Sequence, residues 1–457
     1  ERMRRAGYRT VYLQAARLPF MLKDQFMPRA GYQLVLGEQW FTTAHFRGEW
    51  GVDDRTFFEG GLDVIRELRE RDEPYFLTML TVGTHHPYSV PEDYVNGYPR
   101  GSFPWAVVYL DEVLKPFFQG LEEMGVFEDT LVIFTSDEAV GLAQAQDDFT
   151  QMVSQGWGYL GVRNPEGVSG MVSEPYMQTD LALSILDYLG VVEPGDETLP
   201  FSGRSVFRTY SEPRTLAFGN VYLERVAGVG PTGHLVGCKI GWEECSKWRL
   251  EDGKIFSPHR VAEPLEPGDL GFLAAHVKYS RKTRPSSPEE GFGSSDEGAR
   301  PDLYEYRLIR EKVVPLVGGE EKQWVFGGQF FTVPAHALLE VDLEVSLQAD
   351  EGVDGSPTAR LYHDLGVDRG VRLYEREVAL APGQTARFRY AYRAGDEPIN
   401  RLESRLWVTE HPSSGLHLDF GSVVLTVTPS SADGLPADAE RPEGVARDDF
   451  EGPSAGE

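Results

Sequence analysis

The sequence predicts an α/β domain followed by a C-terminal antiparallel β-sandwich. Mostly apolar runs at 75–82 and 130–135 flank a segment at 105–124 in which apolar residues recur at helical spacing. This order is typical of a strand–helix–strand unit in a parallel sheet that is covered on both faces. Further along, residues 339–347 alternate between apolar and polar. That alternation is typical of half-buried strands in two facing sheets.

The order of the remaining elements supports this fold class. Strand patterns at 7–13 and 31–36 precede a helical pattern at 51–70, and a later helix at 176–189 is closed by Gly190. Strands and helices therefore alternate down to about residue 255, as expected of an α/β domain. Further strands are expected in the C-terminal part at 323–332, 360–363, 371–379, 385–392, 405–409 and 423–428.

Composition divides the 457 residues into four segments. Residues 1–255 form the predicted α/β domain, and residues 256–317 connect it to the β-sandwich at 318–430. Within the connection, residues 281–302 are rich in Pro, Gly, Ser and charge, which predicts a mobile loop. Residues 431–457 are rich in Pro, Gly, Ala and acidic residues without an apolar period, so they are expected to form a disordered acidic tail.

The charge and the absence of long apolar segments limit the classes of protein. The formal net charge is −28, which argues against nucleic-acid binding because that needs a basic face. No stretch approaches the roughly 18 apolar residues that would span a membrane, and no signal peptide is visible. The chain begins at Glu1 rather than at an initiator Met. We therefore expect an upstream part of the protein to precede it.

The chain has two cysteines, Cys238 and Cys245, separated by six residues. Two interpretations are open: a pair of free thiols, or a local disulfide formed in an oxidising compartment. A zinc site is not expected, because neither cysteine belongs to a CxxC pair and His234 is the only nearby imidazole.

Polar side chains follow two of the predicted strands. His85 and His86 follow the strand at 75–82, and Asp137 and Glu138 follow the strand at 130–135. In open α/β sheets ligands bind beyond the carboxyl ends of the strands, so we expect a site near His85 and Asp137. The simpler alternatives are hydrogen-bonded structural histidines in a Pro-containing loop and solvated carboxylates in a turn.

Several segments together resemble one family. They are residues 76–94 (FLTMLTVGTHHPYSVPEDY), 109–141 (YLDEVLKPFFQGLEEMGVFEDTLVIFTSDEAVG) and 172–191 (VSEPYMQTDLALSILDYLGV). They are similar to the extracytoplasmic domain of lipoteichoic-acid-synthase-like phosphoglycerol transferases, in the sulfatase and alkaline phosphatase superfamily. Residues 50–58 (WGVDDRTFF) and the later Gly203-Arg204-Ser205 match further signatures. The resemblance implies a mixed sheet sandwiched by helices over roughly 1–255, and does not extend to the β-sandwich.

The resemblance assigns metal ligands to the end of the second strand. The family has an Asp-His pair there, and Asp137 matches the Asp whereas Glu138 stands where the His is expected. A second carboxylate suits a cation that prefers oxygen ligands, so Mn²⁺ or Mg²⁺ is expected, with Ca²⁺ and Zn²⁺ left open. The change also brings catalytic competence into question.

The resemblance also assigns substrate-binding residues. The family's substrate-binding His falls on His85, with His86 beside it. Its Trp and Arg, which contact a polar head group, fall on Met21 and Lys23. Lys23 keeps the positive charge but lacks the two-pronged geometry with which Arg binds phosphate. Taken alone, Lys23 would be interpreted as a solvated surface lysine.

The family's nucleophile is not expected within this chain. Its threonine nucleophile and an acidic metal ligand are expected upstream of residue 1. A sulfatase would instead need a C/S-x-P-x-R motif; the chain contains none, but the matching region is also upstream. Transferase and sulfatase therefore both remain open.

The resemblance implies metal-dependent phosphoryl or phosphoglycerol transfer, or hydrolysis of sulfate or phosphate esters, on a cell-envelope lipid or glycan. The expected partner is an anionic lipid head group or a sulfated or phosphorylated glycan. The expected location is the extracytoplasmic face of a bacterial membrane, with anchoring through upstream helices.

The alternative is a degenerate, non-catalytic envelope protein whose β-sandwich binds glycan or a partner protein. Glu138 and Met21 favour this alternative, whereas His85 and Asp137 favour the enzyme. Aromatic residues of the predicted sandwich either stack on sugar rings or pack in its core; they are Trp324, Tyr362, Tyr374, Tyr390, Tyr392 and Trp407.

Overall fold

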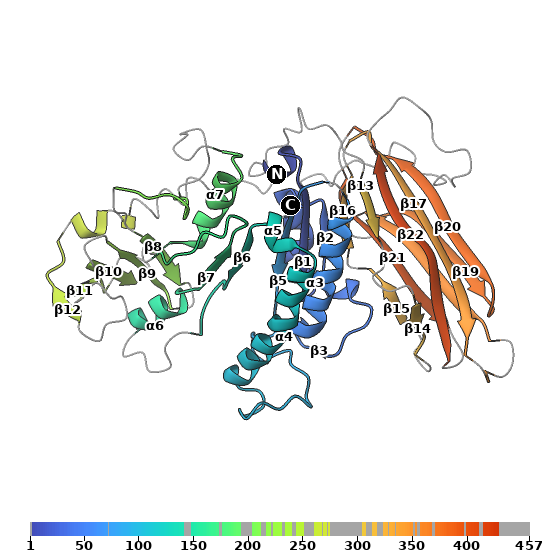
Figure 1. The fold of residues 1–457 in the computed structure, drawn as a ribbon, viewed down its shortest axis with the longest axis horizontal. Helices are drawn as coiled ribbons and strands as arrows, with labels where there is room; N and C mark the ends of the chain where they lie inside the picture. Colours follow the sequence, from blue (N-terminus) through green and yellow to red (C-terminus); the bar gives the residue numbers. More distant parts are fainter. Residues whose placement is uncertain are drawn as a thin grey trace, which may run out of the picture. The chain divides into compact units, whose positions relative to one another are not determined.

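The computed structural model forms two compact units, one of residues 1–124 with 295–457 and one of residues 125–294 (Figure 1). The predicted loop at 281–302 and the predicted tail at 431–457 lie outside the described residues. The structure describes residues 2–71, 73–140, 148–172, 176–192, 203–211, 216–220, 223–230, 234–239, 244–250, 260–266, 268–271, 273–274, 304–307, 313–317, 323–327, 329–333, 335–350, 352–353, 357–367, 371–396, 399–410 and 415–428.

A mixed eight-stranded sheet forms the first unit's centre. Strand β1 (Arg9–Gln14) runs parallel to β2 (Leu34–Leu36) on one side and to β5 (Tyr75–Leu80) on the other. Strand β16 (Gln329–Val333) adds antiparallel to β2 (Figure 1). The sheet then continues through β21 (Ile399–Glu410), β18 (Ala359–Val367) and β19 (Val371–Leu380), while β15 (Gln323–Phe326) pairs with β21. The predicted parallel strands are therefore present, in a sheet that also contains C-terminal strands.

Two amphipathic helices pack against each other beside this sheet. Helix α3 (Asp54–Arg69) confirms the helical pattern at 51–70, and α4 (Phe103–Glu123) confirms that at 105–124. The rings of Phe58 and Phe117 join them with centroids 4.7 Å apart. The first unit's shorter elements are α1 (Arg2–Arg5), η1 (Phe20–Leu22), α2 (Lys23–Ala30), η2 (Glu38–Trp40), β3 (Arg47–Gly48) and β4 (Gly51–Val52).

The first unit contains a second sheet, which is antiparallel. It faces the C-terminal strands of the mixed sheet across one apolar core. Strand β17 alternates between buried and half-buried residues, as the period of two predicts. The predicted C-terminal antiparallel strands are thus confirmed. This sheet has the order β13 (Tyr304–Arg307), β22 (Leu416–Thr428), β17 (Leu338–Ala349) and β20 (Thr385–Arg393), and β14 (Val313–Pro315) pairs with β22.

Strand β16 connects the two cores of the first unit. Phe330 contacts the core of the N-terminal strands with Tyr12 and Val35, while the next residue, Phe331, contacts the C-terminal core. Phe330 also pairs with Val35 of β2 in the sheet. The domain limits given by composition stay predictions. The pairing of β2 with β16 shows that strands of the predicted 1–255 and 318–430 segments share one sheet.

The second unit differs from the sequence prediction in its strand pairing. Strand β6 (Val132–Thr135) pairs antiparallel with β7 (Leu160–Arg163), whereas parallel pairing beside β5 was predicted. An apolar run specifies a strand but not its partner, which explains the difference. The helices here are α5 (Val126–Asp129), α6 (Asp148–Gln155) and α7 (Gln178–Tyr188), and Gly190 follows α7 at φ 66°.

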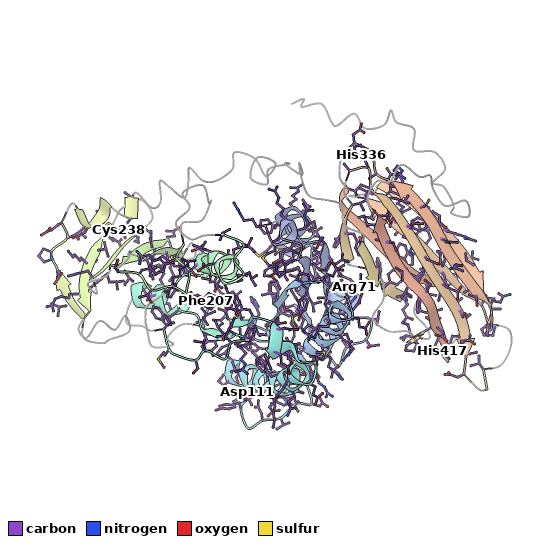
Figure 2. All side chains as sticks on the ribbon, turned by 45° about the horizontal axis from the view of Figure 1, so that its top comes forward. Arg71, Asp111, Phe207, Cys238, His336 and His417 are labelled. Carbon is purple, nitrogen blue, oxygen red and sulfur yellow. A yellow bond between two sulfur atoms is a disulfide. The ribbon has the colours of Figure 1, made fainter. Side chains whose placement is uncertain are left out.

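The predicted alternation of strands and helices ends well before residue 255. Five consecutive strands form an antiparallel sheet in sequence order. They are β8 (Leu216–Asn220), β9 (Arg225–Val229), β10 (His234–Lys239), β11 (Ser246–Leu250) and β12 (Arg260–Glu263). Cys238 at the end of β10 forms a disulfide with Cys245, just before β11 (Figure 2). Of the two interpretations of the cysteines, the structure contains the disulfide.

Candidate active site

His85 lies in the turn that follows β5, at the carboxyl end of the parallel strands. Its side chain is exposed, and its ring packs on Trp50 with centroids 4.2 Å apart. Nδ1 lies 2.7 Å from the carbonyl oxygen of His86. Since a carbonyl only accepts, Nδ1 donates this bond and carries a proton, which leaves the Nε2 lone pair of neutral His85 to act elsewhere.

An aromatic contact connects the His85 turn to the segment of the two predicted head-group residues. Phe20 of η1 packs edge-on against Trp50 with centroids 5.0 Å apart. Met21, the next residue, has 74% of its surface exposed and a φ of 57°, and Lys23 begins α2. The structure therefore brings η1 to the same aromatic cluster as His85.

Trp50 and Phe20 were not among the predicted site residues. The signal for Trp50 was present in the family-like segment at 50–58, where the tryptophan stands directly before the glycine of β4. Phe20 carries no comparable signal, because a single exposed phenylalanine before a short helix has no characteristic spacing. His86 is exposed, and it contributes its carbonyl oxygen to His85 and a ring contact to Tyr88.

Two buried carboxyl groups lie at the start of α3, behind the His85 turn. Asp53 caps the helix by accepting the N–H groups of Arg55 and Thr56. Asp54 is fully buried, and its Oδ1 accepts the backbone N–H of Gly83 at 3.2 Å. Burial raises the pKa of Asp54 to about 7; the Gly83 bond opposes this shift and the Asp53 charge adds to it.

Asp137 and Glu138 lie in the second unit, after β6, whereas His85, His86, Met21 and Lys23 lie in the first. Both carboxylates are exposed, and neither forms an ion pair within the described part of the chain. Oδ1 of Asp137 accepts the backbone N–H of Glu138 at 2.9 Å. The idea that these six residues form one site therefore stays a prediction.

The chemistry of this donor set suits a hard cation. Asp137 and Glu138 present carboxylate oxygens at one strand end. Mn²⁺, Mg²⁺ and Ca²⁺ all accept carboxylate oxygens as ligands. Gln178 of α7 donates to the carbonyl oxygens of Ser136 and Asp137 and so fixes this strand end. Within the described ranges, no group of three or more His, Cys, Asp or Glu side chains is arranged to hold a metal ion. The two carboxylates thus fit part of a coordination shell.

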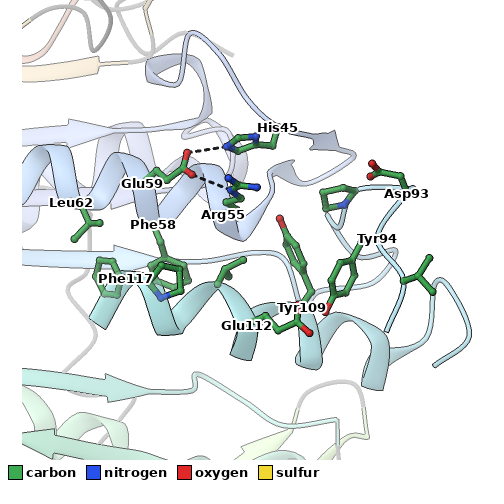
Figure 3. A pocket seen from close by; sticks show the side chains of 14 residues that line it. His45, Arg55, Phe58, Glu59, Leu62, Asp93, Tyr94, Tyr109, Glu112 and Phe117 are labelled. Carbon is green, nitrogen blue, oxygen red and sulfur yellow. Dashed lines mark hydrogen bonds and ion pairs between the residues drawn. The ribbon is translucent and has the colours of Figure 1, made fainter. Parts of the chain in front are cut away.

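A pocket of about 830 Å³ opens between α3, α4 and residues 91–95 (Figure 3). Glu59 lies between His45 and Arg55, at 2.9 Å and 3.1 Å from their nitrogens. Tyr109 also lines the pocket. None of the predicted site residues lines it.

The aromatic residues of the C-terminal strands divide between surface and core. Trp324 is 51% exposed, and its ring meets that of Trp407 at 5.0 Å; Tyr362 stacks on the other side of Trp407 at 4.6 Å. These three rings form a row across β15, β21 and β18. Tyr374 and Tyr390 stack at 4.0 Å instead, and Tyr390 is buried in the core. Tyr392 packs against the same core.

Comparison with known proteins finds similarities for the N-terminal part of the chain. A family model described as Sulfatase matches residues 1–191, which include His85, Trp50, Asp137 and Glu138. Residues 1–191 are therefore similar to the sulfatase family. The predicted resemblance to phosphoglycerol transferases of this superfamily is confirmed by the curated relatives.

Curated relatives include phosphoglycerol transferase I of Escherichia coli strain UTI89, which is 25% identical over 209 residues. The match covers 41% of this chain and 26% of that protein, so the chain spans about a quarter of its relative's length. A transferase of the same name from Shigella boydii matches equally over 209 residues. These relatives support the prediction of a transferase or hydrolase of the sulfatase superfamily.

Solved structures agree with the predicted fold. A protein of the alkaline phosphatase superfamily from Vibrio parahaemolyticus aligns with TM-score 0.50 and 18% identity, over 61% of this chain and 67% of that chain. The lipoteichoic acid synthase LtaP from Listeria monocytogenes aligns with TM-score 0.45 and 15% identity, over 61% and 72%. The first of these similarities shows the fold. Within the described ranges, no helix is both long and apolar enough to cross a bilayer.

Proposed function

We propose that this chain serves phosphoryl or phosphoglycerol transfer, or hydrolysis of a phosphate or sulfate ester, on an anionic lipid head group or glycan of the cell envelope. The observation that carries the proposal is the arrangement of His85: its ring lies on Trp50, and its Nδ1 is bound to the chain's own backbone. The matching phosphoglycerol transferases support the choice of substrate class.

His85 would contact such a substrate in one of two protonation states. In its protonated form Nε2 donates a charge-assisted hydrogen bond to a non-bridging phosphoryl oxygen. In its neutral form Nε2 accepts a proton from a hydroxyl group. The bond from Nδ1 to the His86 carbonyl fixes the ring in both states. Lys23, at the start of the neighbouring α2, would add a positive charge for the phosphoryl oxygens.

Asp137 and Glu138 would hold a divalent cation, with Mn²⁺ or Mg²⁺ preferred. A bound cation neutralises charge on the phosphoryl group and lowers the pKa of a hydroxyl nucleophile. The proposed substrate class implies a location at the extracytoplasmic face of a bacterial membrane, and the Cys238–Cys245 disulfide is in keeping with an oxidising compartment.

A binding experiment on the full chain tests this proposal without requiring turnover. Free Mn²⁺ is measured by electron paramagnetic resonance, and sn-glycerol 1-phosphate is titrated by calorimetry with and without Mn²⁺. The double variant Asp137→Asn/Glu138→Gln should lose Mn²⁺ binding. His85→Gln should bind the phosphate ester about tenfold more weakly, as expected for the loss of one charge-assisted hydrogen bond.

Matched controls separate these effects from a general loss of charge. Glu123→Gln removes an exposed carboxylate from α4, and His336→Gln removes an exposed histidine from a turn. Both should behave as the wild type. If His85→Gln binds the phosphate ester as tightly as His336→Gln does, the assigned role of His85 is wrong.

A second candidate function, a non-catalytic glycan-binding envelope protein, has one specific observation in its favour. Trp324 exposes half of its surface at the end of the Trp324–Trp407–Tyr362 row, where a sugar ring would stack. Trp324→Ala should then lower retention on cell-wall polysaccharide in affinity electrophoresis. Trp157→Ala, which removes a tryptophan that is 44% exposed in the second unit, should not. Equal retention of both variants would exclude this aromatic row as the binding surface.

A further inference from the structure

A buried carboxyl group supports the turn that carries His85. Asp54 is fully buried, and its Oδ1 accepts the Gly83 N–H at 3.2 Å. Its Oδ2 is also buried and has no hydrogen-bond partner among the described residues. A buried ionised carboxylate with an unsatisfied oxygen is costly, so the protonated form is favoured.

The backbone of the turn lies directly on this carboxyl group. A Cβ atom at Gly83 would lie 2.1 Å from Oδ2 and 2.6 Å from Oδ1 of Asp54, so only glycine fits at this contact. The turn itself is closed by the His85 N–H, which donates to the Val82 carbonyl at 3.0 Å. A displacement of Gly83 is therefore transmitted directly to His85.

The groups that face Asp54 increase the cost of its charge. Asp53 precedes it in the chain and lies close enough to oppose a second negative charge. Tyr109 of α4 faces both carboxyl groups but donates its hydroxyl to Asp53 Oδ1 at 2.6 Å, and burial followed by the Asp53 bond raises its pKa, so it stays neutral. The nearest arginine in sequence, Arg55, binds Glu59 instead. Within the described part of the chain, Asp54 has no cationic partner.

We propose that Asp54 is a positioning residue for His85: its neutral carboxyl group holds the 83–87 turn closed, and its ionisation opens that turn. An ionised Oδ2 gains free energy from hydration, and water reaches it when the Gly83 backbone moves away. The consequence for substrate binding rests on the role proposed for His85. The raised pKa of Asp54 places the change close to neutral pH.

Hydrogen exchange of the full chain, measured by mass spectrometry between about pH 6 and pH 8, tests the turn itself. Protection of the 82–88 peptide, corrected for the intrinsic pH dependence of exchange, should fall about tenfold over this range as Asp54 ionises in the closed state. Asp54→Asn keeps the acceptor for Gly83 and stays neutral, so its protection should not change. The control Asp63→Asn, at a partly exposed position of the same helix, should follow the wild type.

A second readout separates this proposal from the proposed function. The affinity for sn-glycerol 1-phosphate should fall more steeply between about pH 6 and pH 7 in the wild type than in Asp54→Asn, and the difference should level off above that range. If the exchange profile follows the prediction but the phosphate ester does not bind, the Asp54 proposal is supported and the proposed function on phosphate esters is contradicted. Phosphate-ester binding with the same exchange profile in wild type and Asp54→Asn overturns the Asp54 proposal.

The wild type alone also decides the matter if Asp54→Asn does not fold. The 82–88 peptide is then compared with a peptide from β17 in the same samples, since β17 pairs with β20 and β22 in the other sheet of the first unit. A protection ratio that stays constant over the pH range overturns the proposal.

Discussion

Replacing Asp364 by alanine should lower the free energy of unfolding of the C-terminal strands by about 3–5 kcal/mol, because it removes the buried carboxylate that accepts both hydrogen bonds of the partly buried Arg405. The Asp364 side chain is fully buried, and its two oxygens each accept a hydrogen bond from Arg405 at 2.7 Å. Arg372 approaches the same carboxylate at 3.3 Å. Urea denaturation followed by tryptophan fluorescence measures the loss, since Trp324 and Trp407 lie on the same sheet.

The chain contains a matched control for this prediction. Asp342 makes the same two-pronged contact with Arg387, at 2.8 Å and 2.6 Å, but its side chain is 30% exposed. Asp342→Ala should therefore cost only about 0–1 kcal/mol. The double variant Asp364→Ala/Arg405→Ala should recover part of the larger loss, because no unpaired buried charge remains. Equal losses for Asp364→Ala and Asp342→Ala would show that burial does not govern the strength of this pair.

Replacing Asp53 by alanine should destabilise the first unit by roughly 4 kcal/mol, from the loss of a helix cap and of the acceptor for two buried hydroxyl groups. Asp53 is fully buried. Besides capping α3, it accepts the Thr56 and Tyr109 hydroxyls, each at 2.6 Å, and the Phe46 N–H at 3.0 Å. Thermal unfolding and hydrogen exchange of an α3 peptide measure the effect.

The cap of α4 provides the comparison. Ser102 Oγ accepts only the Trp105 N–H, at 3.4 Å, as far as the described residues show. Ser102→Ala should therefore cost about 0.5–1 kcal/mol, the lower part of the range for a helix cap. Tyr109→Phe should cost about 1 kcal/mol, since it removes one hydrogen bond but leaves no donor unsatisfied. If Asp53→Ala costs no more than Ser102→Ala, the buried hydroxyl contacts contribute nothing.

Local periodicity explains which parts of the fold could be predicted. The alternation at 339–347 became β17, and the helical spacing at 51–70 and 105–124 became α3 and α4. Strand pairing could not be predicted in the same way. Residues 130–135 have the composition of a strand, yet β6 pairs with β7, because hydrogen-bonding partners are set by segments distant in sequence.

The candidate site shows the same limit. His85 could be found because a histidine directly after a strand is a recognisable pattern and matches a family position. The contribution of Asp54 could not, because it acts through the backbone N–H of Gly83, and any residue type other than proline supplies that group. The stacking of Trp50 on His85 likewise joins side chains from two separate segments.

The pairing of β2 with β16 has a consequence for biosynthesis. Leu34–Leu36 emerges from the ribosome before the second unit, but its partner Gln329–Val333 follows only after the whole second unit has been made. Until then the edge of β2 presents unpaired backbone groups, which are a template for pairing with other chains. A protein built in this way depends on protection of the sheet formed by β1, β2 and β5 until the strands that follow the second unit have been made.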